Sequence, residues 1–356
     1  MNDKNVCSPV RTAFRDQANL CDTFGSEFTA RVLRGVERVI SENTRFGGQI
    51  LNWQGDPGAA ADALPLRAAG ALHGLARSKL EPVLTEAYPP DPAANQGELE
   101  NALKRAISLH DEELVSWLKR APQTNEVGRS AALYAGLMTI AKRTELPMSI
   151  FEIGSSAGLN LILDRYAYEL DSIRCGNLDS SLTLVPAWTG ASLNGAFPEI
   201  IDRRGCDVSP IDASNEDEAG RLAAYIWPDQ PDRIRNLELA VNLFRKDPPV
   251  IDQMDALNWV RKNITPTTED NYTRVLFHSV VFSYLPEESR TAITEHMENA
   301  GANATENSPL AWLMFELDAH IQPKLKLRLW PGGHEEYLAN ADPHVWNIHW
   351  LQGNVT

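Results

Sequence analysis

The sequence is poor in cysteine and has no cysteine pair at the spacing of a metal or redox motif. Its four cysteines are scattered along 356 residues, at Cys7, Cys21, Cys175 and Cys206. That distribution disfavours a disulfide scaffold and a zinc cluster, and it fits a reduced cytosol. The segment MNDKNVCSPVRT lacks the apolar core of a signal peptide, and no apolar run is long enough to span a bilayer. We therefore expect a soluble, cytoplasmic protein.

Positive charge is also scarce. Lys and Arg together number 33 against 48 Asp and Glu, which gives a formal net charge of −15 at pH 7. A surface this acidic repels phosphate backbones and anionic lipids, so we expect neither a nucleic acid nor a membrane as a partner. Hydrophobic residues make up 43% and charged residues 23%, which are ordinary globular values, and the length is enough for two domains.

The first 120 residues lack the alternating pattern of β-strands. Apolar residues recur there at helical spacing, and the stretches PGAAADALP and YPPDPAANQG supply loops between helices. We predict a helical N-terminal domain over 1–120 and an α/β domain over 121–356, divided near the helix-breaking Pro122. The helical domain is either purely structural or a cap over a substrate site, and the sequence does not decide between the two.

The stretch MSIFEIGSSAGLNLILDRY, 148–166, carries the most informative pattern. An apolar run predicts a buried strand, the small residues from Gly154 to Gly158 predict a sharp turn, and apolar residues at helical spacing predict a helix after it. That order places free N–H groups at the carboxyl end of a strand, where open α/β sheets bind nucleotide-like ligands. The glycine fingerprint of dinucleotide sites is absent, and a carboxylate at Glu152 would repel a pyrophosphate but suit a cation.

This pattern, Glu152-x-Gly154-x-x-x-Gly158, resembles the first motif of class I methyltransferases that use S-adenosylmethionine (SAM). The resemblance implies that the acid, the glycines and the loop N–H groups hold the amino-acid end of SAM. The cofactor-binding residues predicted from this stretch are Glu152, Gly154, Ser155, Ser156, Gly158 and Asn160. A strand-to-helix turn that binds nothing is the alternative.

Two later strand ends supply candidates for the rest of this cofactor. A second strand over 200–208 carries Asp207, whose carboxylate would accept hydrogen bonds from the two ribose hydroxyls, with Asp212 as the alternative. Asp207 follows Gly158 by 49 residues, where Rossmann-like sites expect roughly 20, so we interpret 171–197 as an insertion. A third strand ends at Asp255 and Ala256, a pair that resembles the adenine contact of the methyltransferases. Capping of the following helix by Asp255 is an equal alternative.

A fourth strand over 274–278 ends at His278, close to where the transferring methyl group should lie. Histidine titrates near neutral pH, so His278 is the candidate general base, and a buried, hydrogen-bonded histidine is the alternative. Tyr284 is a weaker candidate for lining the substrate pocket.

The C-terminal part predicts the end of the sheet. A fifth strand over 311–315 is followed by alternating segments around a Pro-Gly-Gly turn, which suggests a terminal antiparallel pair and a seven-stranded sheet. The histidines of this part match no standard metal spacing, so we expect no metal site from His334, His344 and His349.

Five segments together resemble a bacterial family known as domain of unknown function 2332: FEIGSSAGLNLILDRY, APQTNEVGRSAAL, RRGCDVSPID, WPDQPDRI and FHSVVFSYLP. That family is grouped with methyltransferase-like Rossmann folds, so the resemblance implies this fold for most of the chain. It also raises Asn125, Glu126 and Arg129 as substrate-binding residues. Spacing alone gives a capping acid for Glu126 and a surface position for Arg129.

We therefore predict a SAM-dependent methyltransferase that acts on a small molecule. The alternative is a non-catalytic SAM- or nucleotide-binding regulatory module, because the insertion before Asp207 is large and no catalytic tetrapeptide such as N-P-P-Y occurs. An NAD(P)-dependent oxidoreductase is disfavoured by Glu152 and by the missing glycine.

Overall fold

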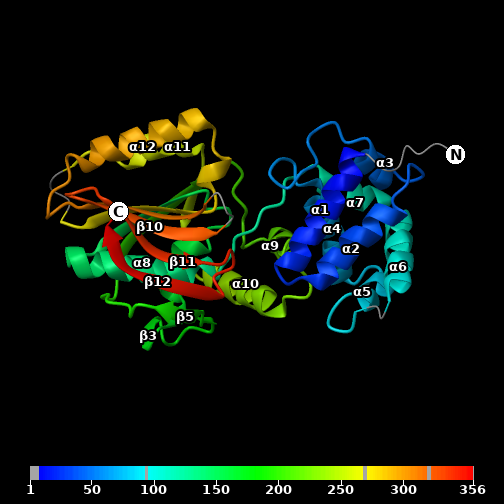
Figure 1. Ribbon diagram of the computed structural model, residues 1–356, viewed down its shortest axis with the longest axis horizontal. Helices are drawn as coiled ribbons and strands as arrows, with labels where there is room; N and C mark the ends of the chain where they lie inside the picture. The colour runs from blue at the N-terminus through cyan, green and yellow to red at the C-terminus, as the bar shows by residue number, and fades with distance from the viewer. Residues whose placement is uncertain (1–7, 93–94, 268–270, 319–321, 356) are drawn as a thin grey trace. The chain divides into compact units, whose positions relative to one another are not determined.

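The computed structural model describes residues 8–92, 95–267, 271–318 and 322–355 (Figure 1). The chain forms two compact units. One contains the residues up to 124 together with 216–235, and the other contains 125–215 together with 236–356. The sequence alone predicts 216–235 as part of the sheet domain, whereas this segment belongs to the helical unit. The division into a cap domain, 1–120, and a methyltransferase-like domain, 121–356, stays a prediction.

The second unit is built on a mixed sheet, which has nine strands among the described residues. Its strands are β1 (Met148–Ile153), β5 (Ala187–Gly190), β6 (Ile200–Asp207), β7 (Val250–Gln253), β8 (Thr273–Ser279), β9 (Leu310–Leu317), β10 (Pro323–Trp330), β11 (Glu335–Ala341) and β12 (Asn347–Val355). The parallel half has the order β7-β6-β1-β8-β9. This is the 3-2-1-4-5 order of doubly wound sheets, and it places the topological switch point between β1 and β8.

The other half of the sheet differs from the expectation. Strands β10, β11 and β12 form an antiparallel meander beside β9, and β5 pairs in parallel with β12 at the edge. The predicted Pro-Gly-Gly turn is confirmed between β10 and β11. The predicted seven strands with one terminal pair are wrong, because the insertion adds β5 and the last antiparallel part has three strands.

The central strands are covered on both faces. Every residue of β1 is buried, as expected for an apolar strand inside a parallel sheet. Helices α11 (Ala256–Asn263) and α12 (Glu287–Gly301) cover one face and pack against Trp312 of β9. Helix α8 (Arg129–Thr144) covers the opposite face, where Gly136 of this helix packs against the side chain of Leu313 in β9. Figure 1 shows these helices on the two sides of the sheet.

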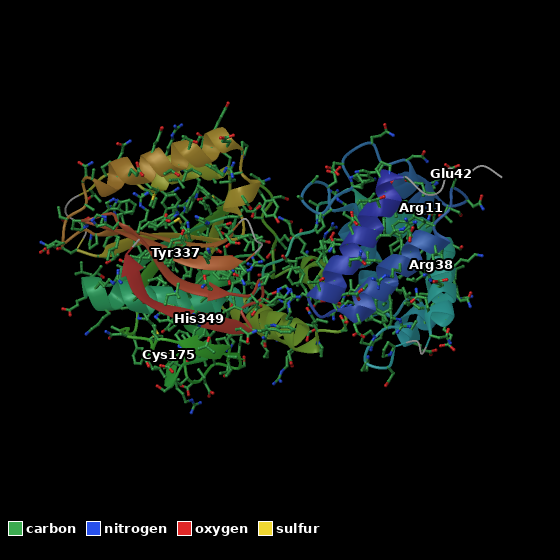
Figure 2. The ribbon with its side chains drawn as sticks, in the orientation of Figure 1. Arg11, Arg38, Glu42, Cys175, Tyr337 and His349 are labelled. Atoms are coloured by element: carbon green, nitrogen blue, oxygen red, sulfur yellow. The ribbon has the colours of Figure 1, made fainter. Side chains whose placement is uncertain are left out.

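The helix expected after the glycine loop is absent. Residues Asn160–Arg165 form a short 3₁₀ helix, η1, and Ile162 within it has non-helical dihedral angles (φ −104°, ψ 24°). The chain then enters a small sheet with the order β3-β2-β4, formed by β2 (Ala167–Leu170), β3 (Ile173–Gly176) and β4 (Thr183–Leu184). Figure 2 labels Cys175 on β3 and His349 on β12. The predicted insertion thus contains structure of its own.

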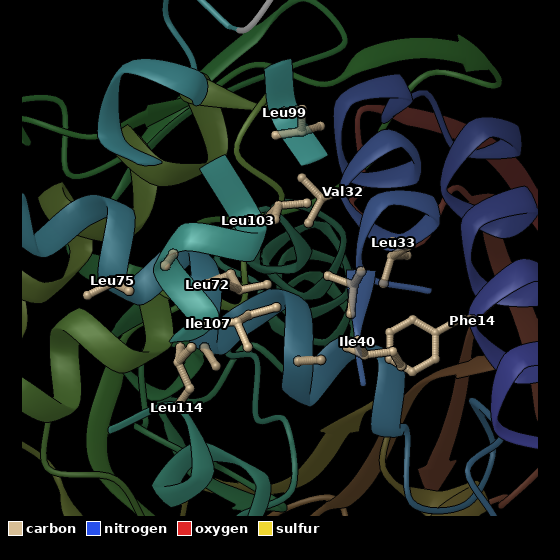
Figure 3. Close-up of a cluster of buried hydrophobic side chains, with 14 of the residues drawn as sticks. Phe14, Val32, Leu33, Ile40, Leu72, Leu75, Leu99, Leu103, Ile107 and Leu114 are labelled. Carbon is tan, nitrogen blue, oxygen red and sulfur yellow. The ribbon is translucent and has the colours of Figure 1, made fainter. Parts of the chain in front are cut away.

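The first unit is helical over its described residues. Its helices are α1 (Pro9–Thr23), α2 (Glu27–Val39), α3 (Arg45–Leu51), α4 (Leu64–Ser78), α5 (Pro82–Ala87), α6 (Gln96–Leu109), α7 (Asp111–Leu118) and α9 (Glu216–Ala224), and α10 (Pro231–Phe244) begins in it. Apolar side chains from α1, α2, α4, α6 and α7 form one core, of which Figure 3 shows Phe14, Leu33, Leu72 and Leu103. Burial of this core stabilises the unit through the hydrophobic effect.

The segment 216–235 is bonded into this helical unit. The carboxylate of Asp229 accepts hydrogen bonds from the Phe28 N–H (2.9 Å) and the Ser26 hydroxyl, and His73 Nδ1 lies 3.0 Å from the Ala224 carbonyl oxygen. Along the described chain, no helix combines the length and the apolar character needed to cross a membrane.

Candidate functional site

A pocket lies at the carboxyl ends of β1, β6 and β7, next to the topological switch point. Including its open mouth it has an empty volume of about 340 Å³. Its described lining consists of Ile153, Gly154, Cys206, Asp207, Val208, Met254, Ala256, Val281 and Leu285. The walls are mainly apolar, and Asp207 carries the one carboxyl side chain among these residues. We name it the switch-point pocket.

The loop after β1 is held by its own backbone and by the end of β6. Ser155 N–H donates to the Cys206 carbonyl (3.0 Å), and Ser156 N–H donates to Asp207 Oδ2 (2.9 Å). Gly154 has φ +67°, and a Cβ there would come within 2.4 Å of the Val281 side chain. Glycine is therefore required at this position both for the backbone conformation and for the close approach of the segment after β8.

Asp207 is the predicted ribose ligand, and it lines the pocket. Its Oδ1 accepts a hydrogen bond from Ser209 N–H (2.8 Å), and its Oδ2 accepts the bond from Ser156. Each carboxylate oxygen keeps a second lone pair, so Asp207 can accept further hydrogen bonds from a ligand. The alternative, Asp212, is not among the described lining residues, and its Oδ1 accepts from Ser214 N–H (2.8 Å).

The predicted adenine pair is split. Ala256 lines the pocket, but Asp255 is the N-cap of α11, with Oδ1 accepting from Asn258 N–H (3.0 Å) and Oδ2 from the Asn258 side-chain amide (2.8 Å). These hydrogen bonds, led by the one from the Asn258 backbone, lower the pKa of the Asp255 carboxyl. The capping alternative therefore describes the Asp255 side chain, and Met254 takes its place in the pocket wall.

Gly158 is packed closely against β7, and its contact with a cofactor stays a prediction. Its φ is +72°, and an added Cβ would lie 2.6 Å from Ile251 Cδ1 of β7. The close neighbour of Gly158 is thus another part of the sheet. A larger residue here would disturb the sheet itself, so it could not report on ligand binding.

Glu152 points away from the switch-point pocket. Neighbouring residues of β1 face opposite sides of the sheet, and Phe151 and Ile153 pack in the core under α11 and α12. Glu152 is 1% exposed, and burial raises the pKa of its carboxyl well above the ordinary value. A buried carboxyl of this kind favours the neutral acid, which does not supply the negative charge that the motif suggested for a cation.

Polar residues around Glu152 form a buried group under the loop. The Ser130 hydroxyl donates to Asn160 Oδ1 (2.7 Å), and Leu159 N–H donates to Asn125 Oδ1 (2.8 Å). Asn160 is 1% exposed and Asn125 8%. Asn125 therefore holds the backbone that follows the glycine loop, and Asn160 connects this segment to Ser130 of α8.

Glu126 and Arg129, from the same APQTNEVGRS segment, contact loops that follow the strands. Helix α8 begins at Arg129, and Glu126 Oε1 accepts a hydrogen bond from the N–H of its N-cap, Gly128 (3.2 Å), which fits the capping position that spacing alone suggests. Glu126 Oε2 lies 3.5 Å from His344 Nδ1. Arg129 donates to the carbonyls of Ser279 and Pro343, each at 3.2 Å. Arg129 therefore connects two loops through its guanidinium, and it is not the surface arginine that spacing suggested. Contact of Asn125, Glu126 or Arg129 with a substrate stays a prediction.

His278 ends β8 with an acidic partner. Its Nδ1 lies 2.6 Å from Glu316 Oε1, and the same oxygen accepts from the N–H groups of Val281 (3.0 Å) and Phe282 (3.1 Å). The ring is completely buried and stacks on Phe282, with centroids 4.9 Å apart. Among the described atoms, His278 Nε2 has no hydrogen-bond partner.

The sequence did not identify Glu316 as the partner of His278, nor six of the nine described lining residues of the pocket. Glu316 stands on β9 directly beside β8, so an acid at the end of the neighbouring strand was the available signal. Two of the six, Ile153 and Cys206, lie at the ends of β1 and β6, and the other four follow β6, β7 and β8: Val208, Met254, Val281 and Leu285. Tyr284, which was predicted to line a pocket, is 66% exposed and is not among the described lining residues.

Metal ligation finds no support in the described chain. No group of three His, Cys, Asp or Glu side chains there could hold a metal ion. His349 Nδ1 is 3.1 Å from the Thr189 hydroxyl, and His344 approaches Glu126.

Comparisons with known proteins give one family and one solved structure. The model of the family "Uncharacterized protein conserved in bacteria (DUF2332)" matches residues 11–350. No curated protein matches. The solved structure is a "DhpI-SAM-HEP complex", 12% identical, with an alignment that covers 60% of this chain and 63% of that chain. The TM-score of this alignment is 0.22.

Proposed function

The chain belongs to this family of uncharacterized bacterial proteins, and from its switch-point pocket we propose that it is a SAM-dependent methyltransferase acting on a small molecule. The supporting observation is a narrow apolar pocket at the switch point of a doubly wound sheet, with the carboxylate of Asp207 at the end of β6. Ligands of such sheets bind in the crevice at the carboxyl ends of the strands.

The lining residues suit the adenosine part of SAM. A purine is flat and apolar on its faces, which matches walls made by Val208, Met254 and Leu285. Two adjacent ribose hydroxyls are paired donors, and a carboxylate is an acceptor with capacity for both. In the proposal, Asp207 binds the ribose and Ala256 lies against the adenine.

The bound cofactor would supply an electrophilic methyl group on a sulfonium. The protein's own contribution is to align the acceptor and to exclude water. In this scheme Glu316 holds the Nδ1 side of His278, which leaves Nε2 as the proton acceptor. The role of His278 as general base stays a prediction, because its ring is fully buried and is not part of the described pocket lining.

The burial of the His278 ring favours a second candidate function, a module that binds SAM but does not transfer its methyl group. No histidine, lysine or tyrosine is among the described lining residues of the switch-point pocket. Binding and turnover therefore have to be measured separately.

The test is calorimetric titration of the full chain with SAM, S-adenosylhomocysteine and NAD. We expect the first two to bind and NAD to give no heat. Ala256→Phe fills the pocket and should weaken binding at least a hundredfold, whereas Ala302→Phe, at an exposed position of the same unit, should leave it unchanged. Asp207→Asn should weaken it about tenfold to a hundredfold through lost charge-assisted hydrogen bonds, with Asp212→Asn as the matched control.

Two results would contradict the proposal. If neither SAM nor S-adenosylhomocysteine binds the wild type, the function is wrong. If binding survives Ala256→Phe in a folded variant, the site is wrong. Release of S-adenosylhomocysteine from SAM in the presence of small-molecule acceptors separates the enzyme from the module.

A further inference from the structure

A second pocket lies within the helical unit. Including its mouth it has an empty volume of about 840 Å³. It is formed by the last turns of α4, by the segment from α5 to Pro90, and by two residues of 216–235. Its described lining consists of His73, Ala76, Arg77, Lys79, Thr85, Tyr88, Pro89, Pro90, Pro228 and Ile234. We name it the helical-unit pocket.

Two buried rings line this pocket. His73 and Tyr88 are 5% and 4% exposed, and their rings stack with centroids 5.9 Å apart and 17° between their planes. His73 Nδ1 is bonded to the Ala224 carbonyl, and burial together with the charge of Arg77 lowers the pKa of His73 to about 4. The imidazole is therefore neutral at pH 7, and the pair forms an uncharged aromatic surface.

The hydroxyl of Tyr88 is the unusual feature of this surface. It is buried and has no hydrogen-bond partner among the described atoms. Buried hydroxyls in folded proteins nearly always have a partner, because an unpaired one is costly. A bound molecule with a polar atom beside the ring would supply that partner.

The rim of the pocket is cationic. Arg77 lies in the last turn of α4 and Lys79 is the C-cap of that helix, while none of the described lining residues is acidic. Cations are also favoured at a helix C-terminus by its dipole, so they alone would not indicate a site. Here they border a pocket lined by Tyr88, whose buried hydroxyl has no hydrogen-bond partner among the described atoms, in a chain whose net charge is −15. A local positive rim on such a protein favours anions over cations.

We propose that the helical-unit pocket binds a small organic anion, whose flat apolar body lies against His73 and Tyr88 and whose carboxylate or phosphate faces Arg77 and Lys79. The apolar walls of Ala76, Pro89, Pro228 and Ile234 accommodate the body of this ligand. This site is separate from the switch-point pocket and does not depend on SAM binding.

The test is calorimetric titration of the full chain with four probes. Phenyl phosphate and benzoate combine a ring with an anion, inorganic phosphate carries the anion alone, and benzyl alcohol carries the ring alone. We expect at least one of the first two to bind, and each of the last two to bind at least tenfold more weakly. The stronger ring-bearing anion identifies the head group as phosphate or carboxylate.

Three variants locate the binding. Arg77→Gln with Lys79→Gln should weaken it at least tenfold, and Arg45→Gln, at a cation of the same unit whose side chain is 71% exposed, should not. Tyr88→Phe keeps the ring and removes only the hydroxyl, so it should fold normally and weaken binding several-fold.

The proposal is overturned if no ring-bearing anion binds, or if inorganic phosphate binds as tightly as phenyl phosphate. It is also overturned if the affinity is the same in the wild type, in the double variant and in Tyr88→Phe. Ala256→Phe should leave this binding unchanged, so a failure here is distinct from a failure of the proposed function.

Discussion

Replacing Glu316 with alanine should lower the free energy of unfolding of the sheet unit by about 3–5 kcal/mol. One carboxylate oxygen accepts three hydrogen bonds, from His278 Nδ1 at 2.6 Å and from the N–H groups of Val281 and Phe282 at 3.0 and 3.1 Å. Alanine would leave three buried donors without an acceptor. Each such loss costs about 1–3 kcal/mol, and partial relaxation makes the total smaller than the sum.

Glu316→Gln separates shape from charge. An amide oxygen in the same place can accept from Val281 and Phe282, so this variant should lose only about 1–2 kcal/mol. Urea unfolding measures the difference through the midpoint and slope of the transition. Hydrogen exchange of the amides of Val281 and Phe282 gives a local reading that does not require the two units to unfold together. Loss of less than 1 kcal/mol in Glu316→Ala, with unchanged exchange at those amides, would refute this reasoning.

The pH dependence provides a second reading of the same variant. Burial raises the pKa of Glu316, but the hydrogen bond and charge of His278 and the N–H groups of Val281 and Phe282 outweigh it and hold the pKa below the ordinary value. A carboxyl with a depressed folded pKa stabilises the fold above its unfolded pKa of about 4.3, and that contribution is lost as pH falls through the folded pKa. The stability advantage of wild type over Glu316→Gln should therefore shrink below about pH 4.3. A difference that stays constant down to acid unfolding would contradict the assignment.

Two further predictions concern the packing of glycines and thiols. An added Cβ at Gly70 would meet the Tyr225 ring at 2.5 Å, so Gly70→Ala should cost about 1–3 kcal/mol in urea unfolding, while Gly220→Ala in α9, with no atom within 4 Å, should be neutral or stabilise by up to about 1 kcal/mol. Equal effects of the two alanines would show that the Tyr225 contact does not matter. The described cysteines are all buried, and burial raises their thiol pKa values, to about 12 for Cys21 and about 11 for Cys175. In a Cys7→Ser background, the native protein should not react with a disulfide reagent at pH 8 until it is unfolded, and rapid native labelling would disprove the burial.

The parallel strands could be located from the sequence because their environment leaves a local mark. The central strands β1 and β8 are buried along almost their whole length, so each contains a short apolar run that can be recognised in the sequence. The same logic failed directly after β1. Leu161, Ile162 and Leu163 are all buried, and their run of apolar character was attributed to a helical face. Apolar character indicates burial but not the backbone conformation that achieves it, and here the chain turns into a small sheet.

Three predicted cofactor-binding residues, Gly154, Asp207 and Ala256, line the switch-point pocket, and each ends or follows a strand that could be located from the sequence. The packing of Gly158 could not be predicted, because its neighbour Ile251 lies 93 positions away and leaves no sign in the local pattern. For Asp255 the two alternatives predict the same residue type, because both a cap and a ligand contact need an acceptor. Only its bonds to Asn258 distinguish them.

The discontinuity of the helical unit has a consequence for synthesis on the ribosome. Roughly 90 residues of the sheet unit are translated between residue 124 and the segment 216–235 that completes the helical unit. At about 5–20 residues per second, the early helices wait some 5–20 s for Ala224 and Asp229, the partners of His73 and Phe28. During that interval the face of α4 that packs against Ala224 and Tyr225 is uncovered, and a chaperone could recognise this apolar surface. A fragment ending at residue 124 is in the same state permanently, so expression of the helical unit alone requires 216–235 to be joined to it.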